Sequence, residues 1–201
     1  MITHAVGISL GGSSAVESGV AVREIASGKL IHLDKLFSIN DVVLFFDNYP
    51  SLKNSVICIS LPWDNTMLEG KWRILSKPYQ LIHSSREEFP NKDNWMQRFS
   101  TRGCDLVTSL KEKGADISRF EIYLTRQKLH LYSNYKERSS ADCKFLQASL
   151  RTEWDFNELP SNMMPAAQLE AICGTILGCE KLKGNTETIF QFKDTDVINL
   201  V

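Results

Sequence analysis

The sequence contains no long apolar run and almost no excess of charge. No window approaches the roughly 18 uninterrupted apolar residues of a membrane-spanning helix, and the first residues lack the pattern of a signal peptide. Lys and Arg number 23 against 24 Asp and Glu, a formal net charge of −1. We therefore expect a cytoplasmic protein without membrane contact. Its overall charge does not drive it onto nucleic acid, although a local basic patch can still bind one.

Cysteine and histidine are present but show no ligand or disulfide spacing. The cysteines number five, and Cys173 and Cys179 are too far apart for a Cys-x-x-Cys metal site. The four histidines show no metal-ligand spacing either. We expect buried, reduced thiols. A chain of 201 residues with 43% hydrophobic residues can form a core without a disulfide or a structural metal.

Hydrophobic patterns in the first third predict strands. Apolar residues and turn signals indicate strands at 5–10, 18–25 and 30–37, which short turns join into an antiparallel meander. Ser38 is a candidate N-cap for a helix that ends near Asn48. The next apolar, β-branched run, Val56 to Leu61, is typical of a strand buried on both faces.

The later part of the chain reads mainly as helices. We interpret 66–100 as an irregular insertion, with any helix around 94–99 being short. The remaining patterns predict further elements, which are a helix at 104–113 with Gly114 as its cap, a fifth strand at 120–124, a helix at 139–150, a long helix from Pro165 to about Lys183, and a terminal hairpin of 188–192 and 197–201.

This order of elements predicts an α/β fold. The meander and the strands after it form a mixed five-stranded sheet, with parallel strands added beside the meander and helices on its faces. We expect strand 5–10 at the centre beside 56–61. The whole chain, 1–201, is interpreted as one domain. The layout is that of the ribonuclease H-like (RNase H-like) folds, which include the actin-like ATPases.

Four segments in order carry a more specific resemblance. They are Val6–Leu10 (VGISL), Val56–Pro62 (VICISLP), Arg102–Asp105 (RGCD) and Ala167–Gly174 (AQLEAICG). Together they span nearly the whole chain and resemble the RNase H-like domain-of-unknown-function family 429, whose members are described as predicted nucleases. The insertion at 66–100 is outside this resemblance.

The resemblance implies a nuclease site in which carboxylates hold two divalent cations, Mg²⁺ or Mn²⁺. This chain departs from the pattern, because Ser9 and Ser60 stand where the family carries aspartates of the first and central strands. Serine supplies no negative charge for a divalent ion. Glu170 remains at the late-helix position, and Asp64 and Asp105 are further candidate carboxylates.

The leading hypothesis is a catalytically impaired RNase H-like protein that acts as a binding or assembly module, with a protein or nucleic acid as partner. One alternative is an active metal-dependent nuclease or phosphoryl-transfer enzyme, which alone would need Mg²⁺ or Mn²⁺. Its rearranged site would use the catalytic candidates Glu170, Asp64 and Asp105, lined by Ser9, Ser60 and Arg102.

Two simpler interpretations remain open. Asp105 could only stabilise a helix start, and the serines could only satisfy neighbouring backbone. A further alternative is a nucleotide-binding, actin-like domain whose loop at Gly11–Ser14 (GGSS) holds a phosphate. A plain hairpin turn also explains that loop.

Overall fold

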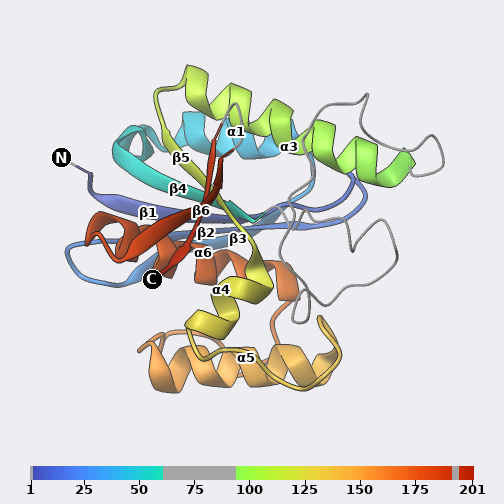
Figure 1. Cartoon of the computed structure of the whole chain (residues 1–201), viewed down its shortest axis with the longest axis vertical. Coiled ribbons are helices and arrows are strands. Elements are labelled where there is room, and N and C mark those ends of the chain that lie inside the picture. Colours follow the sequence, from blue (N-terminus) through green and yellow to red (C-terminus); the bar gives the residue numbers. More distant parts are fainter. Residues whose placement is uncertain (1, 61–93, 192–194) are drawn as a thin grey trace.

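The computed structural model describes residues 2–60, 94–191 and 195–201, which build a mixed sheet with helices on both faces (Figure 1). The elements are β1 (His4–Ser9), β2 (Ser18–Glu24), β3 (Leu30–Leu36), α1 (Ile39–Asn48), the 3-10 turn η1 (Pro50–Asn54), β4 (Ser55–Ser60), α3 (Asn94–Glu112), β5 (Asp116–Phe120), α4 (Ile122–Lys128), α5 (Ser140–Glu153), α6 (Ala166–Leu182), β6 (Thr186–Gln191) and β7 (Asp196–Leu200).

The sheet has the strand order β3-β2-β1-β4-β5-β7-β6. β1 is antiparallel to β2 and parallel to β4, and β5 and β7 continue the parallel part. The predicted mixed sheet with β1 beside β4 is therefore confirmed. Within the described residues the sheet has seven strands rather than five, because the terminal hairpin joins it through β7 and buries Val197 and Ile198 there.

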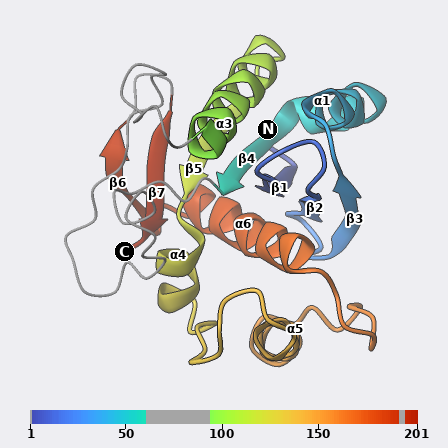
Figure 2. The ribbon, with the colours of Figure 1, turned by 90° about the vertical axis from the view of Figure 1, so that its right-hand side faces the viewer.

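Helices cover the sheet in separate layers. Figure 2 shows α1 and α3 on one face and α6 across the other, with α5 outside α6. The hydrophobic core is divided in the same way, because side chains alternate between the two faces along each strand. Ile57 and Ile59 of β4 pack in the cluster that includes Leu106 of α3, whereas Cys58 packs in the cluster around Ile172 of α6.

Helix α6 lies in direct backbone contact with the sheet. A Cβ atom placed on Gly7 of β1 would be 1.8 Å from the carbonyl oxygen of Ala171, and one on Gly19 of β2 would be 2.0 Å from that of Ala167. On the helix side, a Cβ on Gly174 would be 2.8 Å from the Cα of Gly7. Glycines on both sides of the contact therefore allow the helix to pack directly on the sheet.

Two predictions about helix ends are confirmed. Ser38 and Asp41 form a reciprocal capping box at the start of α1, which lowers the pKa of the Asp41 carboxyl. Gly114 adopts a positive φ of 82° after α3, as a helix-terminating glycine does.

Two elements differ from the prediction. β5 covers 116–120 rather than 120–124, because Glu121 caps α4 with its side chain and the apolar run continues into that helix. Arg119, only 1% exposed, gives the true strand a polar sequence and hides it from pattern analysis. α3 is one helix of 19 residues, so it begins well before the predicted start at 104, and residues 94–100 are helical rather than irregular. The rest of the predicted insertion, 66–93, lies outside the described residues. A glycine at position 103 costs a helix only about 1 kcal/mol.

The cysteines are all free, and Cys58, Cys143 and Cys173 are buried as predicted. Burial raises the pKa of the Cys58 and Cys173 thiols to about 12, so both stay protonated. Cys104 and Cys179 are half-buried. Among the described residues, no helix is both long and apolar enough to span a membrane.

The contact of α6 with the sheet leads to a first prediction. Gly7→Ala should lower the free energy of unfolding by about 1–3 kcal/mol, because the new methyl group must push the α6 backbone away from β1. Gly12→Ala is the control, since a Cβ at Gly12 meets nothing within 4 Å, and it should change stability by no more than about 0.5 kcal/mol. Urea unfolding measures both, and equal losses would contradict this account of the packing.

Candidate functional site

The ends of two central strands carry serines that face the same helix. Ser9 ends β1, Ser60 ends β4, and the two residues are direct partners in the parallel register. Gly7 of β1 and Cys58 of β4 face α6, so Ser9 and Ser60, two residues further along, face the same layer. Their exposed fractions are 2% and 3%. The edge of the sheet formed by the ends of β1 and β4 is therefore buried at these two residues and bears neutral hydroxyl groups there.

Glu170 of α6 reaches this edge. Its residue is only 2% exposed, and the Ser9 hydroxyl donates a hydrogen bond of 2.6 Å to its Oε2. The contact joins residues far apart in the sequence. It follows from the close packing of α6 against β1, which brings the helix to the end of that strand. The structure thus brings together two of the residues selected from the sequence.

Arg138, from the connection between α4 and α5, takes both oxygens of the same carboxylate. Its Nε donates to Oε1 at 2.8 Å and its Nη2 donates to Oε2 at 2.5 Å. This is the two-pronged geometry in which a guanidinium binds a carboxylate most strongly. The negative charge of Glu170 raises the pKa of Arg138, although the arginine side chain is 48% exposed. Glu170 therefore already has a cationic partner within the protein.

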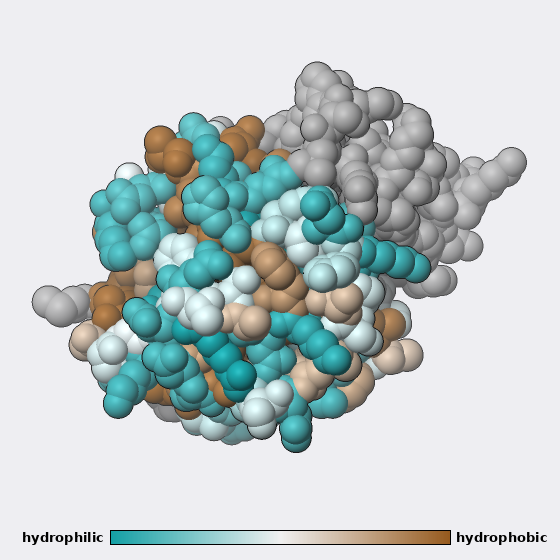
Figure 3. Space-filling view, turned by 90° about the horizontal axis from the view of Figure 1, so that it is seen from below, coloured by the Kyte–Doolittle hydropathy of each residue, from teal (hydrophilic) through white to brown (hydrophobic). Residues whose placement is uncertain are grey.

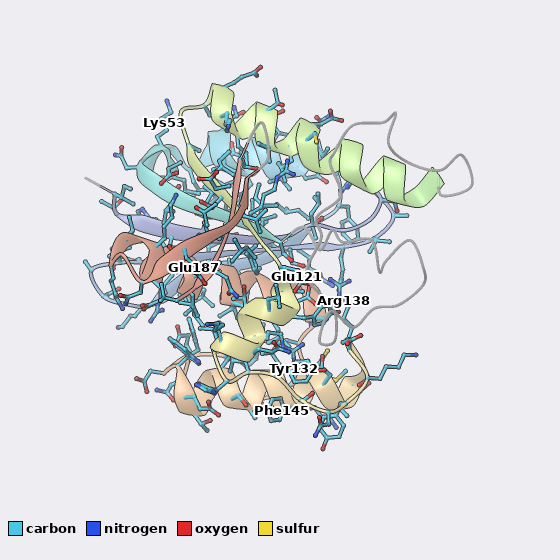
Figure 4. The ribbon with its side chains drawn as sticks, in the orientation of Figure 1. Lys53, Glu121, Tyr132, Arg138, Phe145 and Glu187 are labelled. Atoms are coloured by element: carbon cyan, nitrogen blue, oxygen red, sulfur yellow. The ribbon has the colours of Figure 1, made fainter. Side chains whose placement is uncertain are left out.

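A second carboxylate, Glu121, stands at the same edge. It follows Phe120, the β5 residue paired with Ser60, and it is 1% exposed. One oxygen accepts the backbone amide of Leu124 at 2.8 Å and thereby caps α4. Figure 4 labels Glu121 and Arg138 near the start of α4.

The pKa of the Tyr123 phenol is affected by both carboxylates. Burial raises the pKa of its phenol, and the negative charge of Glu170 raises it further, with a smaller contribution from Glu121. The phenol therefore stays protonated at neutral pH. Sequence analysis missed Glu121 and Tyr123, because both were assigned to the interior of a strand.

The other predicted site residues lie elsewhere. Arg102 of α3 donates to the carbonyl oxygen of Gly11 at 3.0 Å and to that of Phe37, so it ties two loops together. Asp105 is exposed on α3, which covers the face of the sheet opposite to α6, so the structure does not bring it to Glu170. Asp64 lies outside the described residues.

The loop Gly11–Ser14 is held by contacts within the turn. The Gly11 amide donates to the Ser18 hydroxyl at 2.9 Å, and the Val16 amide donates to the Ser13 carbonyl at 3.1 Å. The amide of Gly11, the first residue of this loop, is therefore used within the β1–β2 connection, in agreement with the simple hairpin interpretation.

The residues present do not fit a pair of divalent cations. Such a site needs several carboxylates that are free to bind metal, whereas the strand ends carry Ser9 and Ser60, and Glu170 is bound by a guanidinium. Over the part of the chain that the structure describes, no cluster of three or more His, Cys, Asp or Glu residues could hold a metal ion.

Known proteins resemble this chain in fold but not in sequence. No family model matches it, and no curated protein matches it. Among solved structures it is similar to Thermus thermophilus RuvC in complex with a Holliday junction substrate. The TM-score is 0.55 at 9% identity, over 90% of this chain and 96% of that one. A second structure of Thermus thermophilus RuvC matches over the same shares of both chains, with 9% identity and a TM-score of 0.49.

The fold is RNase H-like. This follows from the first RuvC structure together with the order of the strands. At 9% identity the likeness concerns the fold alone. The fold class is thus as predicted, and family 429 itself stays a resemblance.

The hydrogen bond between Ser9 and Glu170 leads to a second prediction. Ser9→Ala should lower the free energy of unfolding by about 1.5–3 kcal/mol, because it removes a buried donor from a charged acceptor. Ser14→Ala, at an exposed position of the adjoining loop, should cost no more than about 0.5 kcal/mol. Chemical denaturation of both variants checks this. A Ser9→Ala variant with the same free energy of unfolding as the wild type would show that Glu170 does not need the hydroxyl.

Proposed function

We propose that the chain is a catalytically impaired RNase H-like protein that acts as a binding or assembly module. The observation that carries this proposal is that the carboxylate of Glu170 is already bound by side chains of the protein itself. Its two oxygens accept from Arg138 and Ser9, and no carboxylate stands at either serine position.

The chemistry of phosphodiester cleavage explains why this arrangement weakens catalysis. Two-metal sites hold their ions roughly 3.5–4 Å apart with shared carboxylates, so that one ion activates water and the other stabilises the leaving oxygen. Ser9 and Ser60 contribute no charge to such a site. The Arg138 guanidinium repels a metal ion that approaches the same oxygens of Glu170.

The RuvC likeness suggests the first ligand to test. That protein is described in complex with a Holliday junction, and this chain covers 96% of its length with a similar fold. We propose a four-way DNA junction as the first probe of binding, with no cleavage expected. If the protein does not bind the junction, a protein partner becomes the next candidate to test.

One observation favours the enzyme alternative. Glu121 supplies a buried carboxylate at the end of β5, next to the edge that carries Ser60. An active nuclease or phosphoryl-transfer enzyme would pair it with Glu170 in a rearranged site. This requires Arg138 to leave Glu170 when metal and substrate bind.

A nuclease assay tests the proposed function. The wild-type protein should not cleave labelled four-way junctions, duplex DNA or RNA–DNA hybrids in millimolar Mg²⁺ or Mn²⁺, because the site lacks free carboxylates. Anisotropy measured on the same junction reports binding separately from cleavage. Metal-dependent turnover that Glu170→Ala and Glu121→Ala both abolish would refute the proposal and establish the enzyme alternative.

A further inference from the structure

The conformation of the connection between α4 and α5, residues 129–139, places the Arg138 side chain at Glu170. Arg138 has a left-handed backbone with φ 58°, a conformation that costs a non-glycine residue about 1–2 kcal/mol. The surrounding hydrogen bonds must stabilise it. The Arg138 backbone amide donates to Oδ2 of Asp142 at 3.0 Å, and the Ser139 amide donates to the carbonyl oxygen of Lys136 at 3.0 Å.

Asp142 is the centre of this arrangement. It is 3% exposed, and its two oxygens accept from Arg126 of α4 at 2.6 and 3.1 Å. The Ser133 hydroxyl donates to Oδ1 at 2.8 Å. The carboxylate therefore ties together the end of α4, the middle of the connection and Arg138. Burial opposes the charges of this pair. Its hydrogen bonds and mutual attraction outweigh that effect, so the pKa of Asp142 is lowered and that of Arg126 is raised.

Arg126 adds a further restraint on the connection. Its Nε donates to the carbonyl oxygen of Leu131 at 3.1 Å, and the Leu131 amide donates to the carbonyl oxygen of Arg126 at 2.7 Å. Charged hydrogen bonds thus lead from Arg126 through Asp142 and Arg138 to Glu170, and end at the Ser9 hydroxyl. All of these partners except the Arg138 side chain are buried.

We propose that Arg138 is a tethered cation that occupies the place of a metal ion at Glu170, and that Asp142 is the residue that positions it. This deepens the proposed function and rests on it, since a tethered cation has a permanent role only in a site that does not load metal for catalysis. The tether keeps the local concentration of the guanidinium high, so a free divalent cation competes poorly for Glu170.

The surface on the side of α5 offers a matched control for Arg138. Figure 3 views the molecule from this side, and its surface is mostly hydrophilic with hydrophobic residues scattered among the polar ones. Lys136 is exposed on the same connection, two residues before Arg138. It therefore serves as a matched control, because neutralising it removes a basic side chain from this connection without leaving a buried charge unpaired.

Thermal melting with and without millimolar MnCl₂ tests the tethered cation. Arg138→Gln should melt roughly 5–10 °C below wild type, because it leaves the buried Glu170 charge without its partner. Mn²⁺ should then raise its melting temperature by about 3 °C when the free ion exceeds its dissociation constant tenfold. The wild type and Lys136→Gln should show no such response. Arg138→Gln combined with Glu170→Gln should lose it.

The role of Asp142 needs a readout other than stability. Asp142→Asn should be destabilised and should also acquire a response to Mn²⁺, smaller than that of Arg138→Gln, because Arg138 remains but is no longer held in place. Loss of stability without any Mn²⁺ response would reduce Asp142 to a structural residue. Arg138→Lys keeps a cation at the site and should stay unresponsive, so it and Asp142→Asn decide the matter even if Arg138→Gln fails to fold.

These outcomes separate the two proposals. If Arg138→Gln responds to Mn²⁺ no more than Lys136→Gln does, or if Arg138→Lys responds as Arg138→Gln does, the tethered cation is refuted. The impaired-enzyme proposal then still stands on the nuclease assay. Metal-dependent cleavage by the wild type would refute that proposal, whatever the melting curves show.

Discussion

Backbone contact between α6 and the first two strands fixes the geometry at the strand ends. Gly7 and Gly19 leave no side chain between the sheet and the carbonyl groups of Ala171 and Ala167. The helix therefore lies closer to the sheet than side-chain packing alone would allow. Glu170 is carried within hydrogen-bond distance of Ser9 as a result. The rest of the site, including the ion pair with Arg138, depends on this position.

A buried carboxylate then needs a partner, and this chain supplies one from its own sequence. Isolated buried charges are costly, so Glu170 must bind a cation, gain a proton or be solvated. Arg138 meets the need without an ion from solution. The same solution recurs nearby, where Arg126 neutralises Asp142. The two pairs share the α4–α5 connection, so the shape of that connection and the charge balance of the site are set together.

The candidate site was only partly predictable. Ser9, Ser60 and Glu170 were identified from the resemblance, which aligned them with carboxylate positions of a family. Arg138 was not, because nothing local marks an arginine in a loop as the partner of a residue on a later helix. Glu121 and Tyr123 were missed because a continuous apolar run concealed the change from β5 to α4. The buried Arg119 made the true strand look like a polar segment.

The sequence by itself determined the layered α/β fold and the central pairing of β1 with β4, because these follow from the hydrophobic periodicity and from the order of the elements along the chain. It also determined that the ends of β1 and β4 are neutral, since Ser9 and Ser60 can carry no charge. Only the tertiary structure decided that the hairpin β6–β7 extends the sheet and that Asp105 lies away from Glu170. It alone assigned Arg138 to Glu170, because that contact depends on how a connection held by Asp142 is placed against α6.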